Sequence, residues 1–140
     1  MYTFQWPVRT YVGIGIVEEI GSLVPPDDDR RRAAITSAED AWCQPLNQRI
    51  QERLRAAGYP VVEIFPRVEP NPSWDTVRQG AAFCHEHGVD VIFAIGGGST
   101  MDASKVIAME AGIDDVITVP TTAGTGSELN EWGVITETES

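Results

Sequence analysis

The chain has 140 residues, of which 42% are hydrophobic and 22% charged, and its formal net charge is -11 at pH 7. This length and composition predict one folded domain with a buried core and exclude a disordered chain. No apolar run reaches the roughly 20 residues of a membrane span, and an acidic surface opposes binding to nucleic acid or to anionic membranes. The amino terminus has no basic segment followed by an apolar stretch, so we expect a cytoplasmic protein with reduced cysteines.

The amino-terminal half is predicted to hold a strand, a short helix and a βαβ unit. Residues 2–12 alternate aromatic and polar side chains, which indicates a strand, and Gly13-Ile14-Gly15 then leads into a short helix that ends near Leu23. A strand over 33–36, a helix over 41–57 with Gly58 as its C-cap, and a strand over 61–65 follow.

The second half continues the alternation of strands and helices. Ser73 is a suitable N-cap for a helix over 74–87 that Gly88 ends, and a strand over 91–95, a helix over 100–111 and a strand over 116–119 complete the series. This spacing predicts one α/β domain over 1–140, with a parallel, doubly wound sheet and right-handed crossovers.

The turn Gly96-Gly97-Gly98-Ser99 lies between an apolar strand and an amphipathic helix. Successive glycines let the backbone approach a ligand, and the free amides and positive dipole end of the following helix attract an anion. Tight packing of a helix on a strand also uses such turns, so this signal alone is weak.

A second loop, 121–128, is rich in hydroxyls and glycine and follows the strand over 116–119. Two such loops at the carboxyl ends of strands predict a crevice for a polyphosphate or a dinucleotide. The candidate residues all follow strand ends and are expected on one rim of the sheet: Ser37, Asn71, Gly96, Gly97, Gly98, Ser99, Thr121, Thr122 and Thr125.

Three motifs together resemble the iron-containing (group III) alcohol dehydrogenases: Asn71-Pro72 before a helix, Gly-Gly-Gly-Ser-x-x-Asp-x-x-Lys at 96–105, and Pro-Thr-Thr-Ala-Gly-Thr-Gly-Ser-Glu at 120–128. The resemblance covers nearly the whole chain in order. It implies a Rossmann-like amino-terminal domain of the dehydroquinate synthase-like fold, which binds NAD or NADP. A helical domain that holds divalent iron or zinc would follow it.

The resemblance also implies roles for single residues. Gly97, Gly98 and Ser99 would hold the pyrophosphate, Thr121, Thr122 and Thr125 would line the cofactor, and Asn71 would lie near the adenosine half. Asp102 would bind nicotinamide-side groups or cap free amides. For Lys105, on the same helix face as Asp102, a cofactor role and an ordinary surface ion pair are both open.

The chain departs from the family pattern in three places. Ser37 stands where NAD-dependent members usually carry an acid, which favours NADP, with help from Arg30, Arg31 or Arg32; Glu39 or Asp40 could restore a preference for NAD. Only 112–115 connect the last helix and strand. The family's metal ligands are absent, since neither His85 nor His87 matches them, so we expect a truncated member without its helical metal-binding domain.

The implied function is NAD(P) binding for the metal-dependent interconversion of an alcohol and an aldehyde or ketone. The alternative is a catalytically inactive nucleotide-binding module. A reaction like that of dehydroquinate synthase or glycerol dehydrogenase keeps the fold, but the run over 120–136 favours the alcohol dehydrogenases. The expected partners are a small-molecule alcohol or carbonyl substrate and either the missing helical domain or a second copy, paired through the edge of the amino-terminal strand.

Overall fold

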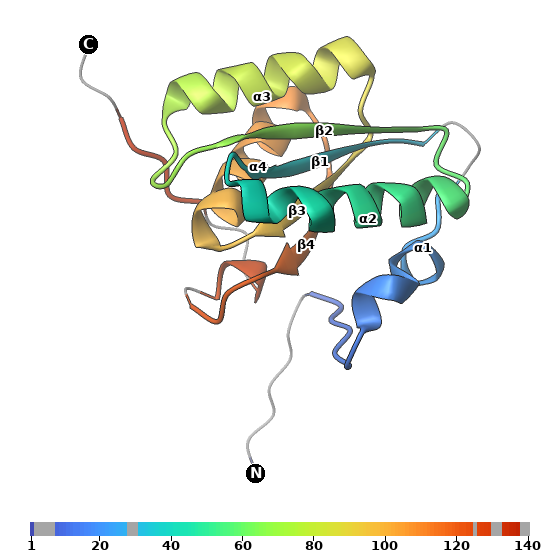
Figure 1. The fold of residues 1–140 in the computed structure, drawn as a ribbon. Coiled ribbons are helices and arrows are strands. Elements are labelled where there is room, and N and C mark those ends of the chain that lie inside the picture. The colour runs from blue at the N-terminus through green and yellow to red at the C-terminus, as the bar shows by residue number, and fades with distance from the viewer. Residues whose placement is uncertain (2–7, 28–30, 125, 130–132, 138–140) are drawn as a thin grey trace.

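The computed structural model describes residues 1, 8–27, 31–124, 126–129 and 133–137, and within them the fold is a parallel four-stranded sheet between two layers of helices (Figure 1). The strand order is β2-β1-β3-β4, and every neighbouring pair is parallel. The predicted parallel, doubly wound α/β sheet is therefore confirmed. The strands are β1 (Arg32–Ala38), β2 (Val61–Val68), β3 (Val91–Gly96) and β4 (Asp115–Pro120).

Each face of the sheet carries its own helices. On one face lies α2 (Gln44–Ala56), preceded by a 3-10 turn (Ala41–Cys43) and packed against the short helices η1 (Ile16–Glu19) and α1 (Ile20–Leu23). On the other face α3 (Trp74–His87) and α4 (Gly98–Ala111) lie side by side (Figure 1). A last 3-10 turn, η3 (Ser127–Leu129), contacts α4 and β4.

Two apolar cores follow from the alternation of side chains along the strands. Ile35 and Phe93 point to the α2 face, where they pack with Ile50 of α2. Ala34, which precedes Ile35 in β1, points to the opposite face, which α3 and α4 cover. All four residues are fully buried. The central strands β1 and β3 are thus covered on both faces, as the unbroken apolar sequence of β3 predicts.

Helices α3 and α4 approach each other closely at Gly80. A Cβ atom added there would lie 2.4 Å from Cδ1 of Ile107, so only glycine fits without displacing the α4 side chain. This contact fixes α4, and therefore the glycine turn at its start, against the rest of the domain.

The predicted amino-terminal strand is wrong for the part of it that the structure describes. Residues 2–7 lie outside the described residues, and 8–12 form no strand. Val12 is 90% exposed. A strand needs a neighbour for its backbone hydrogen bonds, and within the described sheet 8–12 have none. The expected edge for pairing across a dimer is therefore not formed by 8–12.

The remaining elements agree with the sequence to within a few residues. Strand β2 extends to Val68 through Pro66, which an edge strand tolerates because its outer amides need no partner. Helix α4 begins at Gly98 rather than at Thr100, so the third glycine belongs to the helix.

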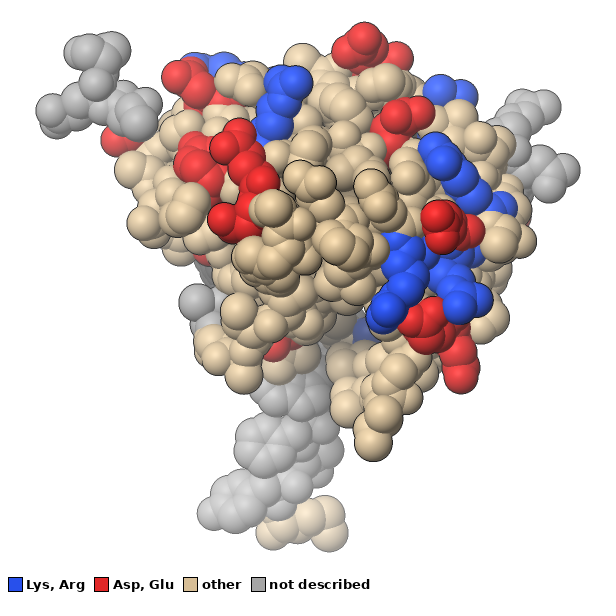
Figure 2. Space-filling view, viewed as in Figure 1, with Lys and Arg blue, Asp and Glu red and all other residues tan. Residues whose placement is uncertain are grey.

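In the view of Figure 2, basic side chains gather on the right with acidic side chains among them, and a separate group of acidic side chains lies on the left. Glu18 of η1 accepts from both Arg49 Nε (2.9 Å) and Arg53 Nη2 (2.7 Å) of α2. These two ion pairs hold η1 to α2.

Candidate functional site

The order in which strands are added to the sheet reverses between β1 and β3, and the candidate residues that the structure describes follow the carboxyl ends of the strands around this point. From β1 the chain crosses to β2 on one side, whereas from β3 it crosses to β4 on the other side, although β1 and β3 are neighbours. In open α/β sheets ligands bind outside the carboxyl ends of the strands at such a switch. The turns after β3 and β4 both lie at this edge.

The start of α4 is free to bind an anion. Its N-cap residue is Gly97, which provides no side-chain hydrogen bond to the helix, and no acidic residue lies in the first turn. The first amides of an α-helix have no intrahelical acceptor, and together with the helix dipole they attract negative charge. The confirmed strand–turn–helix arrangement around 96–99 is therefore suited to a phosphate group.

A close contact requires glycine at position 96 of this turn, and position 97 has little spare room. A Cβ at Gly96 would lie 2.7 Å from Thr100 Oγ1, and a Cβ at Gly97 would lie 3.1 Å from Thr122 Oγ1. The first contact leaves no room for a side chain, and the second shows that the two loops touch. Gly98 and Ser99, the first two residues of α4, are partly exposed.

The second loop is held beside the first by its backbone. The Thr121 amide donates to the Gly96 carbonyl at 2.9 Å, while Thr122 and Gly124 are exposed. The Thr121 Oγ1 atom is buried and has no hydrogen-bond partner among the described residues. A buried hydroxyl normally has a partner, so this atom fits a bound ligand group at the switch point. Thr125 lies outside the described residues.

Asp102 and Lys105 meet through a residue of the second loop. The Ser127 hydroxyl donates to Asp102 Oδ1 at 2.6 Å and accepts from Lys105 Nζ at 2.7 Å, and Lys105 also donates to the Ser127 carbonyl oxygen. Burial lowers the pKa of the Lys105 ammonium, and the carboxylates of Asp102 and Glu128 only partly offset this. The cluster fastens the second loop to α4, a role that the sequence reasoning missed for Ser127.

Asn71 is brought to the glycine turn by the loop after β2. Its backbone amide donates to Ser99 Oγ at 3.3 Å, and its φ of 51° lies in the left-handed region, which asparagine tolerates better than most residues. The loop is fixed by Glu69, whose carboxylate accepts from the Ser73 amide at 2.9 Å and from the Thr76 hydroxyl. Sequence reasoning missed Glu69, although a carboxylate four residues before an N-cap serine is a usable signal.

Ser37 lies near the carboxyl end of β1 but is fully buried, and its hydroxyl donates to the Ala38 carbonyl at 3.3 Å. Glu39 and Asp40 directly after it are exposed.

The suggestion that the arginine cluster assists the cofactor is wrong for the two arginines described. Arg31 and Arg32 lie at the amino end of β1, where Arg31 pairs with Asp27 and Asp115 and Arg32 donates to the His87 carbonyl. A seven-residue strand is about 20 Å long, which separates them from the switch-point edge. Arg30 lies outside the described residues.

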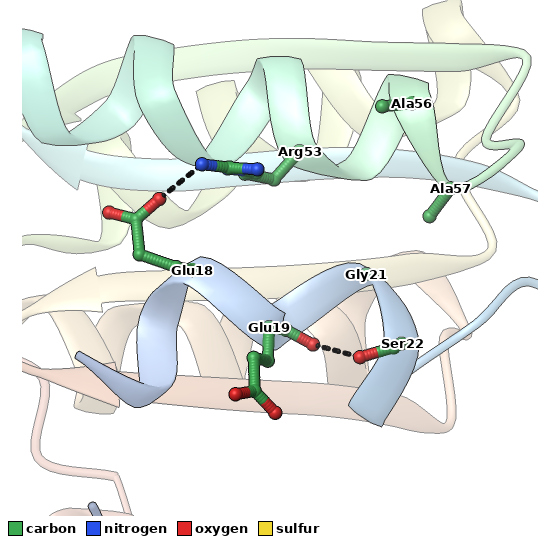
Figure 3. A pocket seen from close by; sticks show the side chains of 7 residues that line it. All are labelled: Glu18, Glu19, Gly21, Ser22, Arg53, Ala56 and Ala57. Atoms are coloured by element: carbon green, nitrogen blue, oxygen red, sulfur yellow. Dashed lines mark hydrogen bonds and ion pairs between the residues drawn. The ribbon is translucent and has the colours of Figure 1, made fainter. Parts of the chain in front are cut away.

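A shallow depression between α1 and α2 lies away from the glycine turns (Figure 3). Glu18, Gly21, Arg53 and Ala57 are among the residues that line it. Glu18 in it already pairs with Arg53, and α1 packs so closely that a Cβ at Gly21 would lie 2.6 Å from that of Ala57. We therefore place the site at the switch point.

Among the described residues, no group of three or more histidines, cysteines, aspartates and glutamates could hold a metal ion. The residues present thus do not fit the divalent metal that the sequence resemblance implies. In the same part of the chain, no helix is long and apolar enough to cross a membrane.

Comparison with known proteins finds relatives that align with nearly the whole chain. The chain is 32% identical to the choline dehydrogenase of Bacillus subtilis, with 99% of this chain and 39% of the relative aligned, and 30% identical to the NAD-dependent methanol dehydrogenase of Bacillus methanolicus, with 98% and 40% aligned. A crystal structure of sulfoacetaldehyde reductase from Bifidobacterium kashiwanohense in complex with NAD+ superposes with a TM-score of 0.77, at 26% identity over 92% of this chain and 38% of that one.

The chain thus spans about 40% of the length of the curated relatives it matches. The model of one protein family, the iron-containing alcohol dehydrogenases, matches residues 7–140. The motifs at 71–72, 96–105 and 120–128 lie within this match, and the two glycine loops meet through the bond from the Thr121 amide to the Gly96 carbonyl. This chain belongs to the iron-containing alcohol dehydrogenase family.

Proposed function

We propose that this chain is the NAD-binding part of a metal-dependent alcohol dehydrogenase that interconverts a small alcohol and an aldehyde or ketone. The observation that carries the proposal is the uncapped start of α4 beside the buried, unpartnered hydroxyl of Thr121. Two relatives whose names or titles mention NAD, a methanol dehydrogenase and a sulfoacetaldehyde reductase, support the choice of ligand.

In this proposal the amides of Gly97, Gly98 and Ser99 bind the pyrophosphate, and the Ser99 hydroxyl donates to it. The threonine hydroxyls of the second loop, at 121, 122 and 125, line the cofactor, and Asn71 lies near its adenosine half. When bound, the nicotinamide supplies or accepts the hydride. Asp102, with one carboxylate oxygen bonded to Ser127, retains the capacity to accept from the nicotinamide side.

We propose NAD rather than NADP as the cofactor. Ser37, which favours NADP in the sequence, is buried, and its hydroxyl already has a carbonyl partner. Arg31 and Arg32 lie at the opposite edge, whereas the exposed acids Glu39 and Asp40 follow β1 at the site's own edge. A carboxylate there accepts from ribose hydroxyls and repels a 2′-phosphate.

Turnover needs a group that polarises the substrate oxygen. The described residues of this chain contain no cluster that could hold a metal, so we assign no catalytic step to them. The second candidate function is a module that binds the nucleotide without chemistry.

Two measurements test the proposal. NADH and NADPH are titrated into the chain and followed by cofactor fluorescence; saturable binding with tighter NADH is expected, whereas clearly tighter NADPH contradicts the choice of cofactor and no binding contradicts the function. Butanol and NAD+ are then supplied with Fe2+ or Zn2+. NADH formation would support the dehydrogenase and contradict the inactive module.

A further inference from the structure

The loop between β2 and α3 is held by one carboxylate, that of Glu69. One oxygen accepts from the Ser73 backbone amide at 2.9 Å, and the other accepts from the Thr76 hydroxyl. Both donors belong to the start of α3, whose N-cap is Ser73. Glu69 therefore closes residues 69–73 into a loop whose two ends are fixed to each other.

This loop forms one hydrogen bond with the residue that follows the glycines, Ser99. Inside it the Asn71 backbone takes a left-handed conformation, with φ of 51°, and its amide donates to Ser99 Oγ at 3.3 Å. A serine hydroxyl has a single hydrogen to donate and two lone pairs. Because Ser99 accepts from Asn71, its own hydrogen is left for another acceptor, and a phosphate oxygen can only accept.

We propose that Glu69 is a positioning residue of the phosphate site, which acts through the Asn71 amide to orient the Ser99 hydroxyl as a donor toward a bound diphosphate. The inference rests on the proposed nucleotide function and deepens it, because it adds a residue that does not itself touch the ligand. Glu69 holds the loop at its β2 end, while the Thr136 amide, which donates to the Pro72 carbonyl at 2.8 Å, holds the far end.

The chain offers a matched control for the charge of Glu69. Asp75 is also an acid near the start of α3, but it is exposed and pairs only with Arg78 at 3.3 Å, a surface ion pair of little worth. Replacing either acid by alanine removes one negative charge beside the helix dipole. Only the Glu69 substitution releases the loop.

The test uses ADP, which contains the diphosphate, and adenosine, which lacks it. Glu69→Ala is expected to weaken ADP binding about fivefold, the order of one lost hydrogen bond, and to weaken binding of adenosine, which only Asn71 in this loop would contact, by less. Glu69→Gln is expected to bind ADP within about twofold of the unchanged chain, because its amide can accept from Ser73 and donate to the Thr76 oxygen. Asp75→Ala is expected to bind both ligands normally. Affinities are measured by calorimetry and folding by urea denaturation.

Three results would overturn the inference: unchanged ADP affinity in Glu69→Ala, an equal loss for ADP and adenosine, or an equal loss in Asp75→Ala. If Glu69→Ala does not fold, Thr76→Val decides in its place, because it removes one donor and keeps the charge; it must weaken ADP binding about threefold and adenosine binding by less. If the unchanged chain binds neither ligand, the proposed function fails together with the inference, a pattern distinct from normal binding that Glu69 does not affect.

Discussion

Substitution of Gly97 by aspartate separates the stability of the glycine turn from its binding capacity. Gly97 has φ of -90° and ψ of -165°, an extended backbone that other residues adopt, and an added Cβ would lie 3.1 Å from Thr122 Oγ1. Thr122 is exposed, so a small shift of its side chain accommodates the new atom. Aspartate is also among the best N-cap residues, so we expect the fold to survive.

Gly97→Asp is expected to raise the free energy of unfolding slightly and to weaken cofactor binding. An aspartate cap is better than glycine by a few tenths of a kcal/mol, and its charge near the helix dipole adds about 0.3–1 kcal/mol, so the free energy of unfolding should rise by about 0.5 kcal/mol after the contact with Thr122 is relieved. The same carboxylate takes the α4 amides and repels a phosphate, which should cost about 1.4 kcal/mol of binding or more, a factor of ten.

The assay is NADH titration beside urea denaturation, with Gly97→Ala as control because it adds the same Cβ without charge. We expect Gly97→Ala to bind within about threefold of the unchanged chain, in keeping with a modest steric contact. Normal NADH binding by Gly97→Asp would refute the assignment of the pyrophosphate to this turn. A loss of binding with a matching loss of stability would refute the reasoning about the cap.

Three other predictions concern hydrogen bonds near the site and a buried cysteine. Ser127→Ala removes the hydrogen bond between Asp102 and the second loop and should lower the free energy of unfolding by about 2 kcal/mol. The control, Ser22→Ala, removes only an exposed bond to the Glu19 carbonyl and should change this free energy by less than about 0.5 kcal/mol. Equal effects of the two substitutions in urea denaturation would contradict the role given to Ser127. Burial raises the pKa of the Cys84 thiol to about 11, so iodoacetamide at pH 8 should label this cysteine only after unfolding, as peptide mass spectrometry would show. Burial alone would raise the pKa of Glu69, but its hydrogen bonds from Thr76 and Ser73 outweigh this and hold the pKa below the ordinary 4.5. The stability advantage over Glu69→Gln should therefore be complete above about pH 5 and shrink as the pH falls below 4.5; an advantage that grows in acid would contradict this.

Sequence periodicity sufficed for the sheet and its helices because each element has a clear boundary signal. Helix α3 begins after its N-cap Ser73 and ends at its C-cap Gly88, as expected, and the apolar run of β3 is buried along its whole length. The glycine turn was predicted from residue type and spacing. The structure differs in that α4 begins at Gly98 rather than at Thr100.

Long-range contacts could not be predicted in this way. Arg31 lies 84 residues from Asp115, and only the folded sheet shows that the two pair at the amino edge, away from the cofactor site. Glu69 and Ser127 likewise act through residues brought close by folding. The amino-terminal segment failed for another reason, because an alternating pattern indicates a strand but cannot provide the neighbour that a strand needs.

The most direct test of the central claim is to map NAD+ binding on the backbone amides of the chain by NMR. The account predicts saturable shifts concentrated at 97–100 and 121–126, with little change around the depression between α1 and α2. Shifts confined to that depression, or none at any NAD+ concentration, would contradict the claim that the two glycine loops form a dinucleotide site.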